Sequence, residues 1–499
     1  MSGHIRWTCH VIAHVESFVY VVNHQLLLVK GKVIRTCSLN DEVNIKITDS
    51  RNQQVHLQST RVARSGEFKL LLDLREHIEL RLTFIYCNAQ QHLRIFHKVS
   101  DNCFRIQPLY IICQGEKGEY STRQGTNGNA DTACQLIDLN LLLVQSLYAE
   151  KLQENGFNRQ SFKLNGHCQI FHSALTCEQA WNSTEDELWH DFGKEILNST
   201  LGRDTSLKFV AFIACTRYNG AAVAALGDFS YANIRRNLKA HAALGGGGLA
   251  LFGSGYFYAW PQSFKDVIPC FQDESKVDLV KFPDDSNYRR THLGVYATSL
   301  GAVCHELGHI FDLGHTENGI MGTGFDYLNR VFTVDNLTEH LPKRQIQKRV
   351  PESKNPKAPL NIPRFTQLKT NGGDFMEKYH EQKCGDSFYF SRNCAVILAH
   401  HLWIKKRHNK ELDAQCANEE PTFDTATQSV LSGGKDALKL IEIRSSSNSL
   451  VDYFYEFSRD ECDEPVFRFN LPACITKLDK THYIFVITVS GCTKRLYFH

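Results

Sequence analysis

A short segment in the second half of the chain carries residues that suit metal-dependent hydrolysis. Residues 304–322 read CHELGHIFDLGHTENGIMG, in which His305 and His309 are four positions apart. On a helix this spacing puts two imidazoles on one face, where both can bind one Zn²⁺ at about 2.0–2.1 Å. Glu306 is rotated by about 100° from the first histidine. We therefore expect its carboxylate to act as a general base toward a water at the metal.

The third ligand of such a zinc site is expected just after the helix, because a catalytic zinc has three protein ligands and an open position for water. His315 lies six residues after His309 and can reach the metal if the chain turns back. Gly314 permits that reversal. The pattern predicts one zinc per chain, bound by His305, His309 and His315, and no other cofactor. Asp312 lies in the same turn, and its carboxylate is the alternative third ligand.

A methionine follows the third histidine at a short separation in the sequence. Met321 comes six residues after His315, within the sequence NGIMG, in a chain that has only 3 methionines. A tight turn that carries a methionine beneath the histidines is the second element of the metzincin signature. A ligand set of three histidines beside a glutamate also favours a catalytic zinc over a structural one, since structural sites are usually rich in cysteine.

The predicted ligand set implies peptide hydrolysis. Three neutral imidazoles leave the charge of the zinc uncompensated, which lowers the pKa of a bound water and polarises a substrate carbonyl. Glu306 would take the proton of the water and pass it to the leaving amine, without a covalent intermediate. We expect a zinc metalloendopeptidase whose partner is a peptide or protein substrate. The alternative is a catalytically silent zinc fold that binds peptides, proteins or glycans.

The elements that must position these residues can be read on either side of the motif. Apolar residues from Val295 to Ile310 form a helical stripe that we expect to end near Leu313. The preceding segment 248–254 is expected to be an edge strand that pairs with an extended substrate. Its predicted substrate-binding residues are Gly248, Leu249, Ala250, Leu251 and Phe252. The alternative is an inner strand whose glycines allow close packing.

The chain as a whole is predicted to be a multidomain α+β protein. Residues 1–104 contain short alternating strands that indicate an antiparallel β-sandwich. Residues 105–410 alternate strands with helices, as an α/β zinc-peptidase domain would. Within them we expect a helix from Asp131 or Thr132 to Gly156 and another from Ser230 to about Ala243. Residues 421–499 return to strand-like runs and form a C-terminal β domain.

Composition sets the remaining expectations. The net charge is +2 from 56 basic and 54 acidic residues, without a strong run of one sign, so neither a nucleic acid nor a membrane is an expected partner. The first residues lack a basic segment followed by an apolar one, which predicts a cytoplasmic protein. The 17 cysteines include no CxxC pair, and we expect most of them to be small buried side chains.

Residues from about 108 to 403 resemble an uncharacterised eukaryotic family of zinc metallopeptidases related to metzincins. The resemblance rests on HELGHIFDLGHTENGIMG, on FDYLNRVF after it and on LGGGGLALFGSGYFYAWP before it. It implies zinc ligands at His305, His309 and His315, a base at Glu306 and a Met-turn at Met321. Some members of the family carry a C-terminal jacalin-like lectin domain, and residues 437–458 and 483–490 are similar to it. The sugar-binding loop of such lectins (GxxxD type) has no counterpart here, so glycan binding is not implied.

Overall fold

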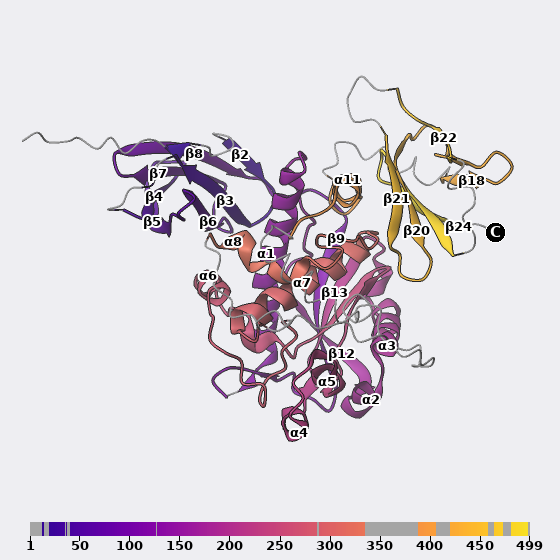
Figure 1. The fold of residues 1–499 in the computed structure, drawn as a ribbon, viewed down its shortest axis with the longest axis horizontal. Coiled ribbons are helices and arrows are strands. Elements are labelled where there is room, and N and C mark those ends of the chain that lie inside the picture. The colour runs from indigo at the N-terminus through magenta and orange to yellow at the C-terminus, as the bar shows by residue number, and fades with distance from the viewer. Residues whose placement is uncertain are drawn as a thin grey trace, which may run out of the picture.

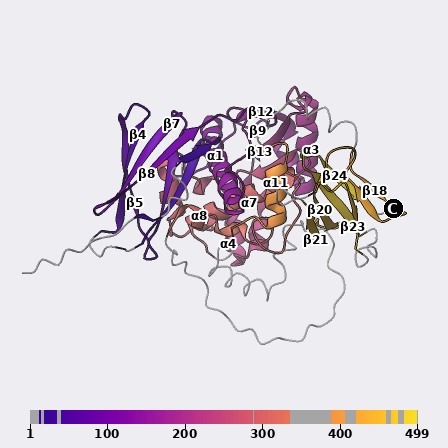
Figure 2. The ribbon, with the colours of Figure 1, turned by 90° about the horizontal axis from the view of Figure 1, so that it is seen from above.

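The computed structural model describes residues 12–13, 19–34, 36, 40–125, 127–286, 289–334, 388–405, 420–457, 464–472 and 481–497. A central α/β body lies between two groups of β-sheets, one from each end of the chain (Figure 1). The view from above also places these sheets at opposite ends of the central body (Figure 2). The expected mixture of helices and several sheets is therefore confirmed.

Two sheets enclose the N-terminal core. In β7 the burial alternates, and its buried residues Leu80, Leu82, Phe84 and Tyr86 lie in the core that the sheets share. In these two sheets all neighbouring strands are antiparallel except β2 and β8. Their parallel pairing differs from the antiparallel sandwich that the sequence predicted. The five-stranded sheet has the order β2 (Val19–Val22), β8 (Ala89–His97), β7 (Glu79–Tyr86), β4 (Glu42–Asp49), β5 (Gln54–Arg61), and the three-stranded sheet has the order β1 (Ile12–Ala13), β3 (Leu26–Val33), β6 (Glu67–Asp73).

The central sheet carries helices on both faces. Along β13, Val210 and Phe212 face the core that contains α1 and α7, whereas Phe209, Ala211 and Ile213 face α2 and α3. The strands are parallel except β16, which runs antiparallel at one edge. The strand order of the central sheet is β12 (Gln169–Thr176), β9 (Arg105–Gln114), β13 (Leu207–Ile213), β17 (Leu249–Gly253), β16 (Ala243–Gly246). Two small ribbons pair β10 (Tyr120–Ser121) with β11 (Asn127–Gly128) and β14 (Arg217–Tyr218) with β15 (Leu238–Lys239).

The helices differ from the sequence-based expectation mainly at their ends. α1 begins after Asn129, not Asp131 or Thr132, because Asn129 and Thr132 cap each other reciprocally. Ser230 does cap α5, but that helix ends at Arg236, well before Ala243. The helices are α1 (Ala130–Glu154), α2 (Cys177–Asn182), α3 (Glu185–Asn198), α4 (Gly220–Leu226), α5 (Tyr231–Arg236), α6 (Val267–Phe271), α7 (His292–Ile310), α8 (Asn329–Phe332) and α11 (Arg392–His400), with 3₁₀ turns η1 (Leu201–Arg203), η2 (Phe257–Ala259), η3 (Phe264–Asp266) and η4 (Phe325–Tyr327).

The C-terminal region forms two antiparallel sheets, one of which packs directly on the central body. In its strands β20 and β23, Leu440 and Phe485 join the central core, while Ile441 and Ile484 face the core between the C-terminal sheets. The packed sheet has the order β21 (Val451–Glu456), β20 (Leu438–Ser445), β23 (His482–Thr488), β24 (Thr493–Tyr497), and the smaller sheet has the order β18 (Thr422–Asp424), β19 (Ser429–Leu431), β22 (Arg468–Asn470).

None of the helices in the described ranges combines the length and the apolar character that a membrane span requires.

Candidate metal centre

The three histidines of the motif converge on one point. α7 is capped by the Thr291 side chain, which accepts a hydrogen bond from the Gly294 N–H, and it presents His305 and His309 from adjacent turns. The Nε2 atom of His309 lies 3.1 Å from Nε2 of His305 and 3.1 Å from Nε2 of His315. His305 and His315 are buried and His309 is half-buried. The structure thus brings together the three rings that the spacing in the sequence predicted.

Backbone carbonyls select the same tautomer and orientation for all three rings. Nδ1 of His305 lies 2.7 Å from the Ile320 oxygen, and Nδ1 of His309 lies 3.0 Å from the Leu313 oxygen. Nδ1 of His315 lies 2.5 Å from the oxygen of Asn448. A carbonyl only accepts, so each Nδ1 must donate, and in the neutral ring each Nε2 then carries a lone pair without a hydrogen. Burial, and then the neighbouring imidazoles, also hold the pKa of His309 well below its usual value.

This donor set fits a zinc ion. Three lone pairs that face one another at hydrogen-bond distance, with no hydrogen between them, repel unless a cation lies among them. Three nitrogens at about 2.0–2.1 Å from a tetrahedral zinc would lie about 3.3 Å apart, close to the 3.1 Å found between the ring nitrogens. Imidazole nitrogen is also a ligand that zinc favours.

The loop after α7 turns back at Asp312, not at Gly314. The helix ends at Ile310, three residues before the expected end, and Asp312 adopts a left-handed conformation with φ 62°. Aspartate tolerates that conformation better than most residues. Gly314 is needed for another reason, because a Cβ there would lie 2.7 Å from the Ser449 oxygen and 2.8 Å from Nε of Arg444. The glycine lets the C-terminal sheet approach the loop.

The Asp312 carboxylate points to the C-terminal sheet and is not part of the converging group. Its Oδ2 accepts a hydrogen bond from Thr493 Oγ1 at 3.0 Å and lies 3.4 Å from His401 Nε2. Burial raises the pKa of Asp312, but the hydrogen bond with His401 and the charge of Lys208 outweigh burial and lower it overall. The alternative of Asp312 as third ligand is therefore not supported.

The C-terminal sheet holds the loop that carries His315. Besides the contact of its ring with Asn448, the His315 N–H donates to the Ser449 oxygen at 2.9 Å, and the Val451 N–H donates to the His315 oxygen at 2.9 Å. Arg444 donates to the Asp312 carbonyl at 2.8 Å. These contacts join residues more than 130 positions apart. They are made largely through the backbone, so no residue type in the C-terminal region signalled them.

Glu306 lies where α7 meets the edge strand β16. Its side chain is 3% exposed, and its carboxylate accepts a hydrogen bond from the Gly245 N–H. A Cβ at position 245 would lie 2.2 Å from the Glu306 carbonyl oxygen, so the close approach of β16 requires glycine. Burial, and then the Glu185 carboxylate, raise the pKa of Glu306 well above its usual value. Glu185, whose carboxylate pairs with Arg235 at 3.2 Å, was not found from the sequence.

Met321 is buried against the helix that carries the histidines. A Cβ on Gly308 would lie 2.4 Å from Met321 Sδ, so the side chain lies directly against α7 between the two histidine positions. The Ile320 oxygen beside it orients His305. The residues expected to form a methionine turn thus lie next to the histidine cluster.

The expected substrate strand is not an edge strand. Leu249, Ala250, Leu251 and Phe252 lie in β17, which pairs with β13 on one side and β16 on the other. All five residues of β17 are buried, and Gly248 precedes the strand. Its main-chain groups are used within the sheet, so the prediction of an edge strand is wrong, and substrate binding by these residues stays a prediction. The alternative of an inner strand with nearby glycines for close packing describes them correctly.

Comparison with known proteins shows which family the chain matches. The family model described as "Putative peptidase family" matches residues 14–374, which include the histidine cluster. A Saccharomyces cerevisiae protein named a putative zinc metalloproteinase is 38% identical over 99 residues, which cover 19% of this chain and 14% of that protein. A Schizosaccharomyces pombe protein with the same description is 23% identical over 248 residues, covering 45% of this chain and 38% of that protein. The chain therefore spans well under half the length of either curated relative.

Solved structures add no support for a particular fold. A β-glucuronidase from Bifidobacterium dentium aligns at a TM-score of 0.13 and 10% identity, covering 46% of this chain and 49% of that chain. A TM-score this low does not indicate a shared fold.

Proposed function

The chain belongs to the putative peptidase family, and we propose that it is a zinc-dependent endopeptidase whose zinc is held by His305, His309 and His315. The observation that carries the proposal is the convergence of three Nε2 lone pairs, each fixed by a backbone carbonyl at Nδ1. The names of the two yeast relatives also support zinc and peptidase activity. The helix, the turn, the third histidine and Met321 together support a metzincin-like arrangement.

The chemistry divides between the metal and the protein. Bound at the three histidines, zinc would polarise the substrate carbonyl and lower the pKa of a water. Glu306 would accept a proton from the attacking water and deliver it to the leaving nitrogen as the C–N bond breaks. The Gly245 N–H orients the Glu306 carboxylate. The three backbone carbonyls hold the imidazoles in a single orientation.

Substrate would lie along β16. In the described part of the chain β16 pairs with a strand on one side only, and its four residues are half-buried. An extended peptide can add to such an edge through main-chain hydrogen bonds, here to the carbonyls of β16, since the N–H groups of Ala243 and Gly245 already donate to Glu185 and Glu306. Because Gly245 contacts the Glu306 carboxylate, a peptide on this edge would pass beside the general base. We propose that the C-terminal sheet supports His315, rather than serving mainly to bind glycans.

Glu306→Gln tests the proposal most directly, because the change is nearly isosteric and leaves the three imidazoles in place. The variant should retain zinc, while hydrolysis of an extended peptide library falls at least about a hundredfold, the lower bound for loss of a general base. Glu317→Gln, an exposed position in the same segment, is the matched control and should cleave like the unchanged protein.

Zinc content separates the remaining outcomes. His309→Ala should lose most of the zinc of this site together with activity, because ligands and site geometry are linked. Equal cleavage by zinc-replete Glu306→Gln and unchanged protein would contradict the proposed base. Zinc-replete protein that cleaves no peptide in the library would instead favour the silent binding module.

A further inference from the structure

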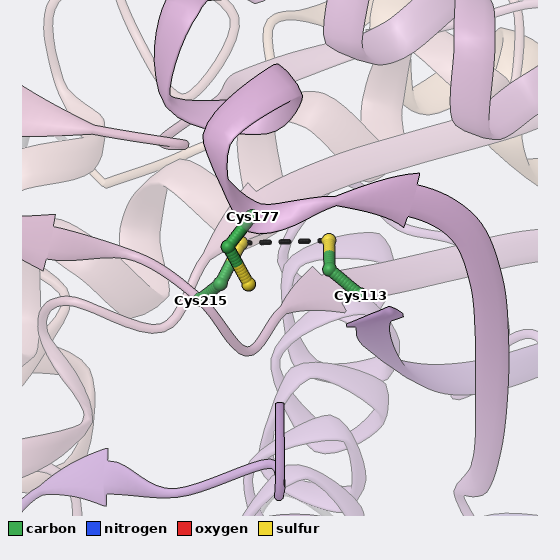
Figure 3. Close-up of side chains that lie close together, drawn as sticks. All are labelled: Cys113, Cys177 and Cys215. Carbon is green, nitrogen blue, oxygen red and sulfur yellow. Dashed lines mark hydrogen bonds between the residues drawn. The ribbon is translucent and has the colours of Figure 1, made fainter. Parts of the chain in front are cut away.

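Three cysteines gather at the carboxyl edge of the central sheet, away from the histidine cluster (Figure 3). Cys113 is the penultimate residue of β9, Cys215 follows the end of β13, and Cys177 is the first residue of α2. Their sulfur atoms all lie within 4.8 Å of one another, and those of Cys113 and Cys215 are 3.5 Å apart. All three are free thiols. Parallel neighbouring strands end at the same edge, which explains why residues so distant in sequence meet there.

The backbone around the thiols is firmly held. Trp181 of α2 donates from its indole nitrogen to the Cys215 carbonyl at 2.7 Å, which ties α2 to the end of β13. Thr176 and Gln179 cap the start of α2 reciprocally and so fix the position of Cys177. Cys113 and Cys215 are buried in the core beneath α2 and α3. The three sulfurs are therefore arranged before any ligand binds.

A cavity opens beside the three cysteines. A cavity of about 270 Å³ is lined by Cys215, Glu116 and Trp181, among other residues. The Glu116 carboxylate accepts a hydrogen bond from the Cys177 thiol. Glu116 is exposed and lies in the loop that follows β9.

We propose that Cys113, Cys177 and Cys215 bind a second zinc ion. Three sulfurs at about 2.3 Å from a tetrahedral zinc lie about 3.8 Å apart, which falls between the 3.5 Å contact and the 4.8 Å limit found here. Thiolate donors select zinc and other soft cations over magnesium or calcium. The three thiols lose their protons to solvent when the ion binds.

This site would be structural. Its ligands are cysteines, as in closed structural zinc sites, and they join β9, β13 and α2. The cysteines belong to the core on one face of the sheet, whereas α7 packs on the other. The inference does not rest on the proposed peptidase activity, because it concerns a separate group of residues.

Cobalt substitution tests the site without any activity assay. Thiolate ligands give Co²⁺ an intense charge-transfer absorption in the near ultraviolet, and imidazole ligands do not. Reduced, metal-free full-length protein titrated with Co²⁺ should bind two ions per chain, one of which produces this absorption. His309→Ala should keep the absorption and lose the other ion. Cys177→Ser, a half-buried position where serine suits a helix start, should lose the absorption and keep the histidine-bound ion.

Controls and a second variant keep the outcome clear. Cys134→Ser removes a thiol that neighbours Cys168 but lies outside the three-cysteine group, so it should leave the absorption unchanged. Cys215→Ser repeats the test on a buried ligand. In a second measurement, zinc should raise the melting temperature of the His309→Ala variant. It should not raise that of the double variant His309→Ala with Cys177→Ser. Absence of the charge-transfer band from reduced unchanged protein would overturn the proposal. So would a band of full intensity in both cysteine variants.

Discussion

The ion pair between Arg444 and Glu442 allows a quantitative test of how the C-terminal sheet supports the histidine cluster. The two side chains are 1% and 0% exposed, and Arg444 Nε donates to Glu442 Oε2 at 2.6 Å. Arg444 also donates to the Asp312 carbonyl in the loop that carries His315. Arg444→Met should remove both contacts and leave Glu442 buried without its partner. Breaking a buried pair in this way costs about 3–5 kcal/mol.

The double variant Glu442→Gln with Arg444→Met separates stability from metal binding. It removes the unpaired charge but keeps an acceptor for the Asn393 amide, which contacts Glu442 at 2.6 Å. Replacing both partners of a buried pair is often close to neutral. The lost hydrogen bond from a charged donor to Asp312 is worth about 1.5–3 kcal/mol. The double variant should therefore be about 1.5–3 kcal/mol less stable than the unchanged protein and more stable than Arg444→Met.

Zinc affinity should not recover with stability. Both variants lack the contact with Asp312, and losing a group that orients a metal ligand typically costs about 10–100-fold in metal affinity. Urea unfolding gives the free energies, and competition with a chromophoric chelator gives the zinc affinities. A cost below about 1 kcal/mol for Arg444→Met would refute the account of the buried pair. Unchanged zinc affinity in the double variant would show that Arg444 does not support His315.

Three further outcomes are expected. Gly314→Ala should weaken zinc binding and lower the melting temperature, because its Cβ would lie 2.7 Å from the Ser449 oxygen; dialysis against graded zinc buffers measures the first effect. Chelation of zinc should lower the melting temperature and zinc should restore it, since a ligand at about 100 times its Kd stabilises by about 2.7 kcal/mol; an unchanged melting curve would contradict a zinc site. Burial, and then the charge of Arg159, lower the pKa of His24 to about 3 from 6.5. Between pH 6.5 and 5 this histidine takes up a proton only in the unfolded chain, so the free energy of unfolding should fall by about 2 kcal/mol. In His24→Leu the free energy of unfolding, measured by urea unfolding at each pH, should fall less steeply with acid.

The histidine cluster was predictable because its geometry is local. His305 and His309 are four positions apart on one helix, and a single turn brings His315 back, so the spacing predicts which three rings meet. The cause of the turn was less predictable, since Asp312 and Gly314 are both plausible sites for a left-handed residue. Only the approach of Ser449 to Gly314 shows that the glycine is needed for packing.

Sheet order was harder to infer than the site. A run of glycines before buried apolar residues is compatible with an edge strand or an inner strand, and burial of β17 on both sides depends on β13 and β16 together. The cysteine group was missed for a similar reason. Its members come from three separate elements and form no CxxC pair, so their proximity appears only once β9 and β13 are placed side by side.

The contacts of His315 have a consequence for how this region folds. Its ring, its N–H and its carbonyl each bond to residues 448–451 of the C-terminal sheet. A metal bound through this ring stabilises the conformation in which those bonds are made, because binding energy at a site that forms on folding adds to folding energy. Unfolding of the C-terminal sheet would in turn release the ring from the carbonyl that holds its Nδ1 hydrogen. We therefore expect zinc binding and the docking of this sheet to be coupled, although the sheet itself supplies no residue to the histidine group.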